Sequence, residues 1–199
     1  MITDETHYLR FASCFQRGRC GIEIPPDVDM HQFQDFKRSN VLPRARKILG
    51  YLQSLYPKTL LDVGYGRGAF LYPLMEAMPH IEISVLDNDP YKITKLEYLK
   101  NGGLNIHPIW GDIAKIPAQD NSFYGVTALE VLEHVPDPGT ALRELVRVAR
   151  QFVLISVPSK PDNNTQHIRL ITKEFVSSAL PGKRITCEWV LGHMLAMIR

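Results

Sequence analysis

The stretch LLDVGYGRGAF at residues 60–70 decides the fold that we expect for this chain. Its first part is an apolar run that contains one acid, and it predicts a buried parallel strand over 59–63. Glycines at positions 64, 66 and 68 permit a tight turn and let a ligand approach the main chain without a Cβ in the way. A helix after this turn would direct its positive N-terminal end toward that ligand. The stretch therefore predicts a strand, a nucleotide-type cofactor loop and a helix in succession.

The spacing of this loop is compatible with two cofactors. The dinucleotide pattern G-x-G-x-x-G/A is satisfied from Gly64 to Ala69, and an acid, Asp87, follows at about the right distance. Asp62, however, stands two residues before the first glycine, where a dinucleotide loop usually stays apolar. A carboxylate there suits a ligand with a cationic group, such as the amino-acid end of S-adenosylmethionine (SAM). An NAD-binding oxidoreductase is therefore the alternative to a SAM-binding protein.

Length and composition indicate a single globular domain with a full core. The chain has 199 residues, of which 45% are hydrophobic and 22% charged. No apolar run reaches the length of a membrane span, and residues 1–5 lack the pattern of a signal peptide. Cys14, Cys20 and Cys187 show no C-x-x-C spacing, which favours a reducing compartment over a disulfide framework or a zinc site. We therefore expect a cytoplasmic protein without a membrane segment.

Charge gives little indication of a macromolecular partner. The formal net charge is +2, with an acidic middle part and a basic tail. No basic run is longer than two residues, so the pattern does not indicate a nucleic-acid partner. A small-molecule partner is the simpler expectation, and the oligomeric state stays open.

Strand and helix patterns alternate along the rest of the chain. Strands are expected at 59–63, 81–86, 104–110, 123–129 and 152–157, and helices at about 68–78, 90–100, 138–149 and 172–180. Repeated β-α-β units imply a parallel sheet with helices on both faces. Residues 184–191 and 194–199 flank Gly192 and His193 and predict an antiparallel hairpin.

The expected fold class is therefore α/β, with a Rossmann-like, doubly wound and mostly parallel seven-stranded sheet that ends in an antiparallel hairpin. One or two helices are expected between Phe33 and Tyr56, interrupted near Pro43. We assign residues 1–56 to an N-terminal helical cap or lid and residues 57–199 to the cofactor-binding core of one compact domain.

Polar side chains follow the predicted strands one after another, and ligands of open α/β sheets bind beyond the carboxyl ends of the strands. Asp87, after the second strand, is placed to accept hydrogen bonds from two ribose hydroxyls. Asp112, after the third, is within reach of an adenine amino group. The fourth strand leads to Leu129 and Glu130, with Glu133 and His134 one turn later. Each acid alone is common in loops, but the ordered set is a specific signal.

With these motifs the chain resembles the class I SAM-dependent methyltransferases. The resembling text is D-x-G-x-G-x-G at 62–68, the acid Asp87, Gly-Asp at 111–112 and E-x-x-E-H-V at 130–135, within roughly residues 58–180. The resemblance implies that SAM is the cofactor and that its methyl group passes to an O, N or C nucleophile of a small-molecule acceptor. It also implies a set of cofactor-binding residues: Asp62, Gly64, Tyr65, Gly66, Gly68, Asp87, Asn88, Asp112, Ile113, Leu129 and Glu130. Tyr65 stands where this family often has Cys or Ser, and it either narrows the pocket beside the sulfonium or simply packs.

His134 is the predicted catalytic residue, because it follows the fourth strand directly and could orient an acceptor hydroxyl or accept its proton. Glu130, Glu133 and His134 lie within one helical turn of sequence, and some members that methylate RNA termini or catechol-type quinone precursors hold a divalent metal with such a set. His167 is a later histidine that could complete a metal site. Many metal-independent members carry the same letters, so we predict no metal and keep a metal-assisted RNA-terminus methyltransferase as an alternative.

The acceptor is expected between residues 1–45 and the loops 130–138 and 158–170, which are the irregular parts able to cover the methyl group. Four phenylalanines of the cap could enclose an apolar or aromatic acceptor, although core packing is expected for at least half of them: Phe11, Phe15, Phe33 and Phe36. A SAM-binding module without catalysis is a further alternative.

Overall fold

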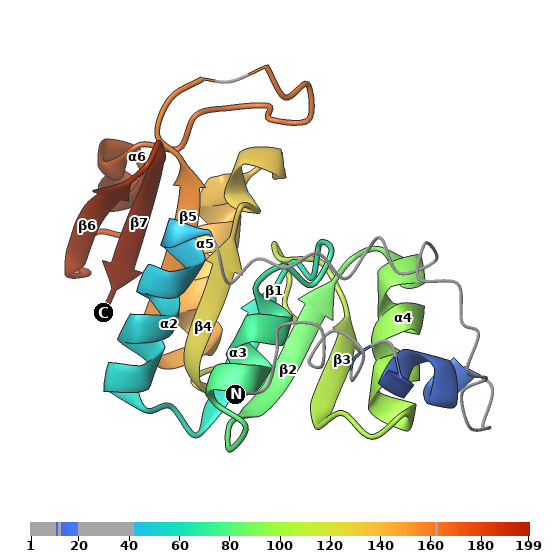
Figure 1. Cartoon of the computed structure of the whole chain (residues 1–199). Helices are drawn as coiled ribbons and strands as arrows, with labels where there is room; N and C mark the ends of the chain where they lie inside the picture. Colours follow the sequence, from blue (N-terminus) through green and yellow to red (C-terminus); the bar gives the residue numbers. More distant parts are fainter. Residues whose placement is uncertain (1–10, 12, 20–41, 162) are drawn as a thin grey trace.

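The computed structural model describes residues 11, 13–19, 42–161 and 163–199, and in this part of the chain it forms the expected seven-stranded sheet. The strand order is β3-β2-β1-β4-β5-β7-β6 (Figure 1). The bounds are β1 Thr59–Val63, β2 Glu82–Asp87, β3 Ile106–Trp110, β4 Phe123–Leu129, β5 Ala149–Pro158, β6 Ile185–Val190 and β7 His193–Ile198. Strands β1 to β5 are parallel to one another, and β7 runs antiparallel to both β5 and β6. The predicted fold class is therefore confirmed.

The hairpin of β6 and β7 distinguishes the topology of this sheet from that of a dinucleotide-binding fold. A dinucleotide fold has the parallel order 3-2-1-4-5-6. Here β7 is inserted antiparallel between β5 and β6, with Ser156 of β5 opposite Leu195 of β7. The first five strands share the dinucleotide order, so the cofactor edge looks alike in both folds. The topology of the last two strands argues against the oxidoreductase alternative.

Helices cover both faces of the sheet, because the parallel strands are apolar on both sides (Figure 1). The bounds are α2 Pro43–Leu55, α3 Leu71–Ala77, α4 Pro90–Asn101, α5 Pro138–Val148 and α6 Lys173–Ala179. One apolar cluster joins α2, α3 and α4 to the sheet, and a second joins α5 and α6 to the opposite face. Leu60 belongs to the first cluster and Leu61 to the second, as the alternation of side chains along a strand requires.

Helix starts follow local sequence signals, with one exception. Asp89, Asp137 and Thr172 accept hydrogen bonds from main-chain N–H groups in the first turns of α4, α5 and α6. The helix expected from residue 68 begins only at Leu71, because Gly68 adopts a left-handed φ of 71° and still belongs to the loop. The glycine loop is therefore longer than its sequence pattern indicates.

The N-terminal residues that the structure describes pack on the core. Helical residues 11 and 13–19 lie beside α4 (Figure 1), where Arg17 Nη2 donates to the Gly102 carbonyl at 2.9 Å. The ring of Phe11 contacts Tyr72 at a centroid distance of 4.5 Å, and Phe15 contacts Tyr98 at 5.5 Å. These two phenylalanines are therefore core packing and do not enclose an acceptor. Phe33 and Phe36 lie outside the described residues.

Helix α2 belongs to the same core as the sheet. Its side chains Ile48 and Leu52 are fully buried in the first apolar cluster. The division at 56/57 into cap and core stays a prediction, since most of residues 1–41 lie outside the described part. No helix in that described part is both long and apolar enough to cross a membrane.

Candidate functional site

The glycine loop after β1 combines two packing glycines with one that faces open space. Gly64, Gly66 and Gly68 have φ angles of 83°, 56° and 71°, which residues with a Cβ rarely adopt. A Cβ on Gly64 would lie 2.5 Å from Val131 Cγ2, and one on Gly68 would lie 2.1 Å from Tyr72 Cε2. A Cβ on Gly66 would meet no atom of the described residues within 4 Å. Gly66 is therefore the position at which a ligand can approach the main chain.

A cavity of about 780 Å³ lies beyond the carboxyl ends of the strands, within the size range of small-molecule sites. It brings together nearly all of the site residues expected from the sequence: Asp62, Gly64, Tyr65, Gly66, Asp87, Asn88, Asp112, Ile113, Leu129, Glu130 and His134. Gly68 instead packs against Tyr72, behind the loop. The lining also includes Arg44 from the first turn of α2 and Asn164 and Gln166 from the loop after β5. None of these three was predicted individually from the sequence, although all lie in the segments 1–45 and 158–170 that were expected to border the acceptor.

Asp62 is a buried carboxyl in the cavity wall, 4% exposed. Burial raises its pKa from 3.8 to about 7, opposed by the Thr127 hydroxyl, which donates to Oδ1 at 2.7 Å; the nearby Asp87 adds to the rise. A buried carboxylate without a cationic partner is costly. A ligand that brings a positive group to Asp62 would therefore stabilise its ionised form.

Asp87 is oriented by main-chain donors at the end of β2. Its Oδ2 accepts from the Tyr65 N–H at 2.9 Å and its Oδ1 from the Asp89 N–H at 3.0 Å. Lys92 Nζ lies 3.7 Å from Oδ2. These contacts leave lone pairs on both oxygens, so the carboxylate can still accept from a pair of ligand hydroxyls.

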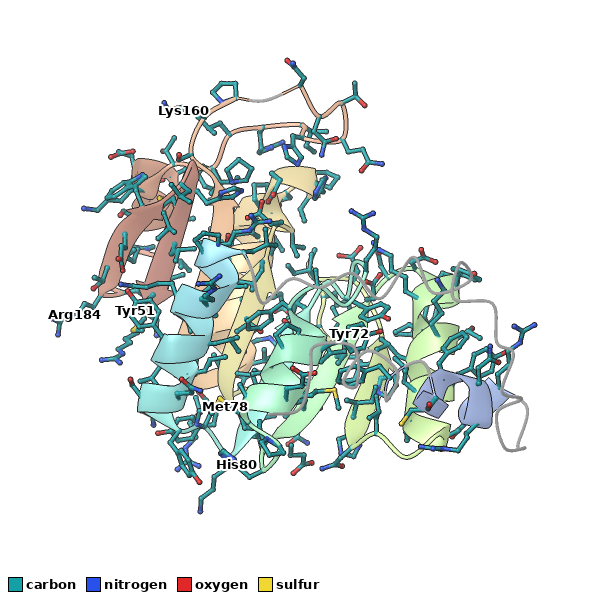
Figure 2. All side chains as sticks on the ribbon, in the orientation of Figure 1. Tyr51, Tyr72, Met78, His80, Lys160 and Arg184 are labelled. Carbon is teal, nitrogen blue, oxygen red and sulfur yellow. The ribbon has the colours of Figure 1, made fainter. Side chains whose placement is uncertain are left out.

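Tyr65 points its ring toward the helical layer. Its hydroxyl is hydrogen-bonded to that of Tyr72, and burial raises its pKa to about 12. The two rings are perpendicular, with centroids 6.4 Å apart, and Figure 2 labels Tyr72 on α3. The side chain of Tyr65 therefore packs between the loop and α3, while its N–H orients Asp87.

Arg147 of α5 holds the loop that follows Asp112, the residue expected near an adenine amino group. Asp112 is exposed at the cavity and accepts from the Ala114 N–H at 2.7 Å. Arg147 donates to the carbonyls of Ile116 and Ala118, at 3.0 and 2.8 Å, and pairs with Glu144, whose other partner is the Ile116 N–H. Arg147 therefore fixes the loop that follows Asp112.

The E-x-x-E-H segment is not one helical turn, contrary to the expectation. Glu130 has a φ of 57°, which ends β4 before the short 3₁₀ helix η2, Leu132–His134, begins. Its Oε1 accepts from Ser156 Oγ at 2.6 Å, and its Oε2 lies 3.1 Å from His193 Nε2. Glu130 is therefore turned toward β5 and β7 and is not part of the cluster formed by Glu133 and His134.

His134 lines the cavity and is held by the loop after β5. Its Nδ1 lies 3.0 Å from the Gln166 carbonyl, which can only accept, so Nδ1 donates in this contact. His134 is also grouped with buried Glu133 and with His167, and one ligand atom from each lies within 4.8 Å of the others. Of the residues considered for the metal alternative, Glu133, His134 and His167 lie together, whereas Glu130 lies apart.

Comparisons with known proteins agree with this geometry. A family model described as a methyltransferase domain matches residues 61–154. A ubiquinone biosynthesis O-methyltransferase of Pseudomonas paraeruginosa is 33% identical over 134 residues, covering 62% of this chain and 54% of the relative. Cycloartenol-C-24-methyltransferase 1 of Oryza sativa is 31% identical over 138 residues, covering 64% of this chain and 39% of the relative. A SAM-dependent methyltransferase structure from Aquifex aeolicus superposes with a TM-score of 0.64 at 21% identity, covering 87% of this chain and all of that one.

The family match indicates a methyltransferase domain in residues 61–154, and the structural likeness shows the fold alone. The chain spans about half the length of the curated relatives it matches. The family match extends from β1 into β5. By their names, the two relatives act on different atoms, oxygen in one and carbon in the other.

Proposed function

We propose that this protein is a SAM-dependent methyltransferase that methylates a small-molecule acceptor, with a hydroxyl oxygen as the nucleophile. One observation carries the proposal: a single cavity joins a buried acid, an open glycine, a main-chain-oriented acid and a histidine whose Nδ1 is held by a main-chain carbonyl, namely Asp62, Gly66, Asp87 and His134. The name of the O-methyltransferase relative favours oxygen over carbon.

The cofactor half of the cavity consists of Asp62, Gly64–Gly66, Asp87, Asn88, Asp112 and Ile113. SAM supplies a methyl group that its sulfonium already activates, so the protein contributes position and exclusion of water. Asp62 would pair with the ammonium group, which suits a buried carboxyl whose pKa is raised to about 7. Asp87 would accept from the ribose hydroxyls, and Gly66 would leave room for the ligand beside the main chain.

The acceptor half consists of Arg44, Glu130, Val131, His134, Asn164 and Gln166. His134 Nε2 would take the proton from the acceptor hydroxyl as its oxygen bonds to the methyl carbon. The carbon–sulfur bond breaks with its electron pair left on sulfur, so the imidazole becomes imidazolium and charge is balanced. The Gln166 carbonyl stabilises that imidazolium through the Nδ1–H.

Titration calorimetry with SAM, S-adenosylhomocysteine and NADH tests the cofactor assignment. We expect binding of both adenosyl ligands and none of NADH. Asp87→Ala should weaken SAM binding by about 1–3 kcal/mol, because it removes the acceptor of two hydroxyls. His107→Ala, an exposed change on β3 outside the cavity, serves as the matched control. NADH binding without any SAM heat would contradict the proposal.

A metal-assisted reaction is the second candidate, favoured by the cluster of Glu133, His134 and His167. One carboxylate and two imidazoles form a donor set that suits Mn²⁺ or Zn²⁺ better than Mg²⁺. The hydrogen bond from His134 Nδ1–H to Gln166 is the kind of contact that orients a metal-binding imidazole. A bound metal would supply Lewis-acid activation of the acceptor hydroxyl, and His134 would then be a ligand rather than a base.

Calorimetric titration with MnCl₂ separates these two roles of His134. Binding that is lost in His167→Ala would favour the metal-assisted reaction. Absence of Mn²⁺ and Zn²⁺ binding would leave proton transfer as the role of His134. His193→Ala is the matched control, since it removes a histidine that is paired with Glu130 instead.

A further inference from the structure

Tyr72 holds the glycine loop from outside the cavity. It is the second residue of α3, is buried, and is not among the residues that line the cavity (it is labelled in Figure 2). Its hydroxyl is hydrogen-bonded to the Tyr65 hydroxyl. Its N–H donates to the Gly68 carbonyl at 3.2 Å, and its ring fills the space in which a Cβ of Gly68 would lie. Tyr72 therefore contacts the loop both at its middle and at its end.

The main chain of Tyr65 connects this support to the acid at the end of β2. The Tyr65 N–H donates to Asp87 Oδ2 at 2.9 Å. Tyr65 stands between Gly64 and Gly66, and glycines leave the main chain free to turn, so its neighbours do not fix the direction of this N–H. The hydrogen bond between the two hydroxyls ties the Tyr65 side chain to α3, and both rings are buried, so breaking the bond would be costly. That bond therefore restrains the N–H from which Asp87 accepts.

The N-terminal helical residues that the structure describes support Tyr72 in turn. The ring of Phe11 contacts the Tyr72 ring at a centroid distance of 4.5 Å. This helical segment is packed on α4 with its main chain in contact, since a Cβ on Gly18 would lie only 1.6 Å from the Tyr98 carbonyl oxygen. The segment cannot shift toward α4, and Phe11 stays against the ring. Support from this side restrains Tyr72 while its hydroxyl holds Tyr65.

We propose that Tyr72 is a positioning residue for the cofactor: its hydroxyl holds Tyr65 so that the Tyr65 N–H directs the Asp87 carboxylate at the two ribose hydroxyls of SAM. The inference rests on the proposed function, in which Asp87 accepts from those hydroxyls, and it adds a residue that lies outside the cavity. Of the two main-chain donors to Asp87, the Asp89 N–H follows β2 itself, whereas the Tyr65 N–H comes from the glycine loop. Loss of the Tyr72 hydroxyl therefore leaves one donor in place and loosens the other.

The test is a double-mutant cycle on the affinity for S-adenosylhomocysteine, measured by titration calorimetry with the whole protein. Tyr72→Phe removes the hydroxyl and keeps the ring beside Gly68 and Phe11. It should weaken binding by about three- to tenfold. In an Asp87→Ala background the same change should alter the affinity by less than about twofold, because the acid through which Tyr72 acts is gone. An effect that does not pass through Asp87 would give equal losses in both backgrounds and would overturn the inference.

Tyr65→Phe removes the other hydroxyl of the pair and should give the same loss as Tyr72→Phe, whether alone or combined with it. Tyr98→Phe is the matched control, because Tyr98 on α4 also packs against the N-terminal helical residues and lies outside the cavity. It should leave the affinity within about twofold of the parent protein. An equal loss in Tyr98→Phe would overturn the inference. Absence of binding by the parent protein would contradict the proposed function, whereas parent binding that Tyr72→Phe leaves unchanged would contradict the inference alone.

Discussion

Asp87 of the cofactor half is a buried acid held by main-chain N–H groups, whereas Glu130 of the acceptor half is a partly exposed acid held by side chains of two other strands. Asp62 and Asp87 are each 4% exposed, and Asp87 accepts two main-chain N–H groups. Glu130 and His193 have about a quarter of their side-chain surface exposed and bond through side chains. Main-chain bonds at strand ends are local and recur wherever the sheet forms. Side-chain bonds between α2, β4 and β7 need a particular tertiary arrangement, so the acceptor half can differ between proteins that share a cofactor half.

The largest expected effect is a loss of kcat in a variant of the acceptor half that keeps its affinity for SAM in the cofactor half. His134→Ala should lower kcat by about 10²–10⁴-fold if Nε2 accepts the acceptor proton, and it should leave the SAM dissociation constant within about twofold. Steady-state kinetics with a hydroxyl acceptor found by screening for release of S-adenosylhomocysteine, and calorimetry with SAM, measure the two quantities. Loss of SAM affinity in this variant would contradict the division into two halves. The control is His107→Ala, a histidine on β3 whose ring faces Glu82 at 3.6 Å.

Two glycines of the cofactor loop provide a matched pair. Gly64→Ala should destabilise the protein by about 2–4 kcal/mol, because it adds strain at φ 83° and a Cβ only 2.5 Å from Val131. Gly66→Ala should lower the free energy of unfolding by about 1–2 kcal/mol, which is the strain of φ 56° alone, because its Cβ meets no described atom within 4 Å. Urea denaturation compares the two. Equal costs would mean that Val131 moves aside without penalty.

Asp62 gives the cofactor half a pH dependence that the acceptor half should lack. With its pKa raised to about 7, Asp62 gains a proton as the pH falls through 7, and the neutral carboxyl no longer attracts an ammonium group. SAM affinity should therefore decrease between pH 8 and pH 6. Asp62→Asn should weaken SAM binding by about 2–3 kcal/mol at pH 8 and remove this dependence, as calorimetry at several pH values would show.

In the ligand-free protein, Asp62 affects the free energy of unfolding, and this effect favours low pH rather than high pH. Its folded pKa lies above the ordinary 3.8, so the native state binds more protons than the unfolded chain between pH 4 and 7. The Asp62 contribution to stability is therefore present at low pH and is lost as the pH rises through 7. Asp62→Asn should raise the melting temperature at pH 8 while it weakens SAM binding. A lower melting temperature at pH 8 would contradict the burial cost assigned to this carboxylate.

The smallest expected effect concerns the loop after Asp112. Arg147→Ala removes hydrogen bonds to two carbonyls and to Glu144, and it should lower stability by about 1–2 kcal/mol, because the guanidinium is partly exposed. Arg143→Ala, which loses one bond to Thr140, should change stability by less than about 0.5 kcal/mol. Thermal denaturation measures both. An equal effect of the two changes would contradict the role of Arg147 in holding this loop.

Residue patterns predicted the strands and the loop at this edge of the sheet well, because their determinants are close in sequence. The strand bounds of β1 and β4 agree with the expected 59–63 and 123–129, and the glycine spacing placed the loop at the end of β1. Helix α3 begins three residues later than expected, since a left-handed Gly68 cannot start a helix. The sequence did not predict that β7 lies between β5 and β6, because an antiparallel hairpin can join a sheet edge with either of its strands.

The sequence by itself therefore determined the class of fold and the gathering of acids at the carboxyl edge of the sheet, through apolar runs, glycine positions and acids that follow consecutive strands. Only the tertiary structure decided what each acid does. Glu130 and Glu133 are three residues apart, yet one turns to Ser156 and His193 and the other is buried beside His134 and His167. The physical reason is that periodicity records which face of an element is apolar. The partner of a polar side chain at a strand end depends on elements that are distant in sequence, here β5, β7 and the loop at 164–167.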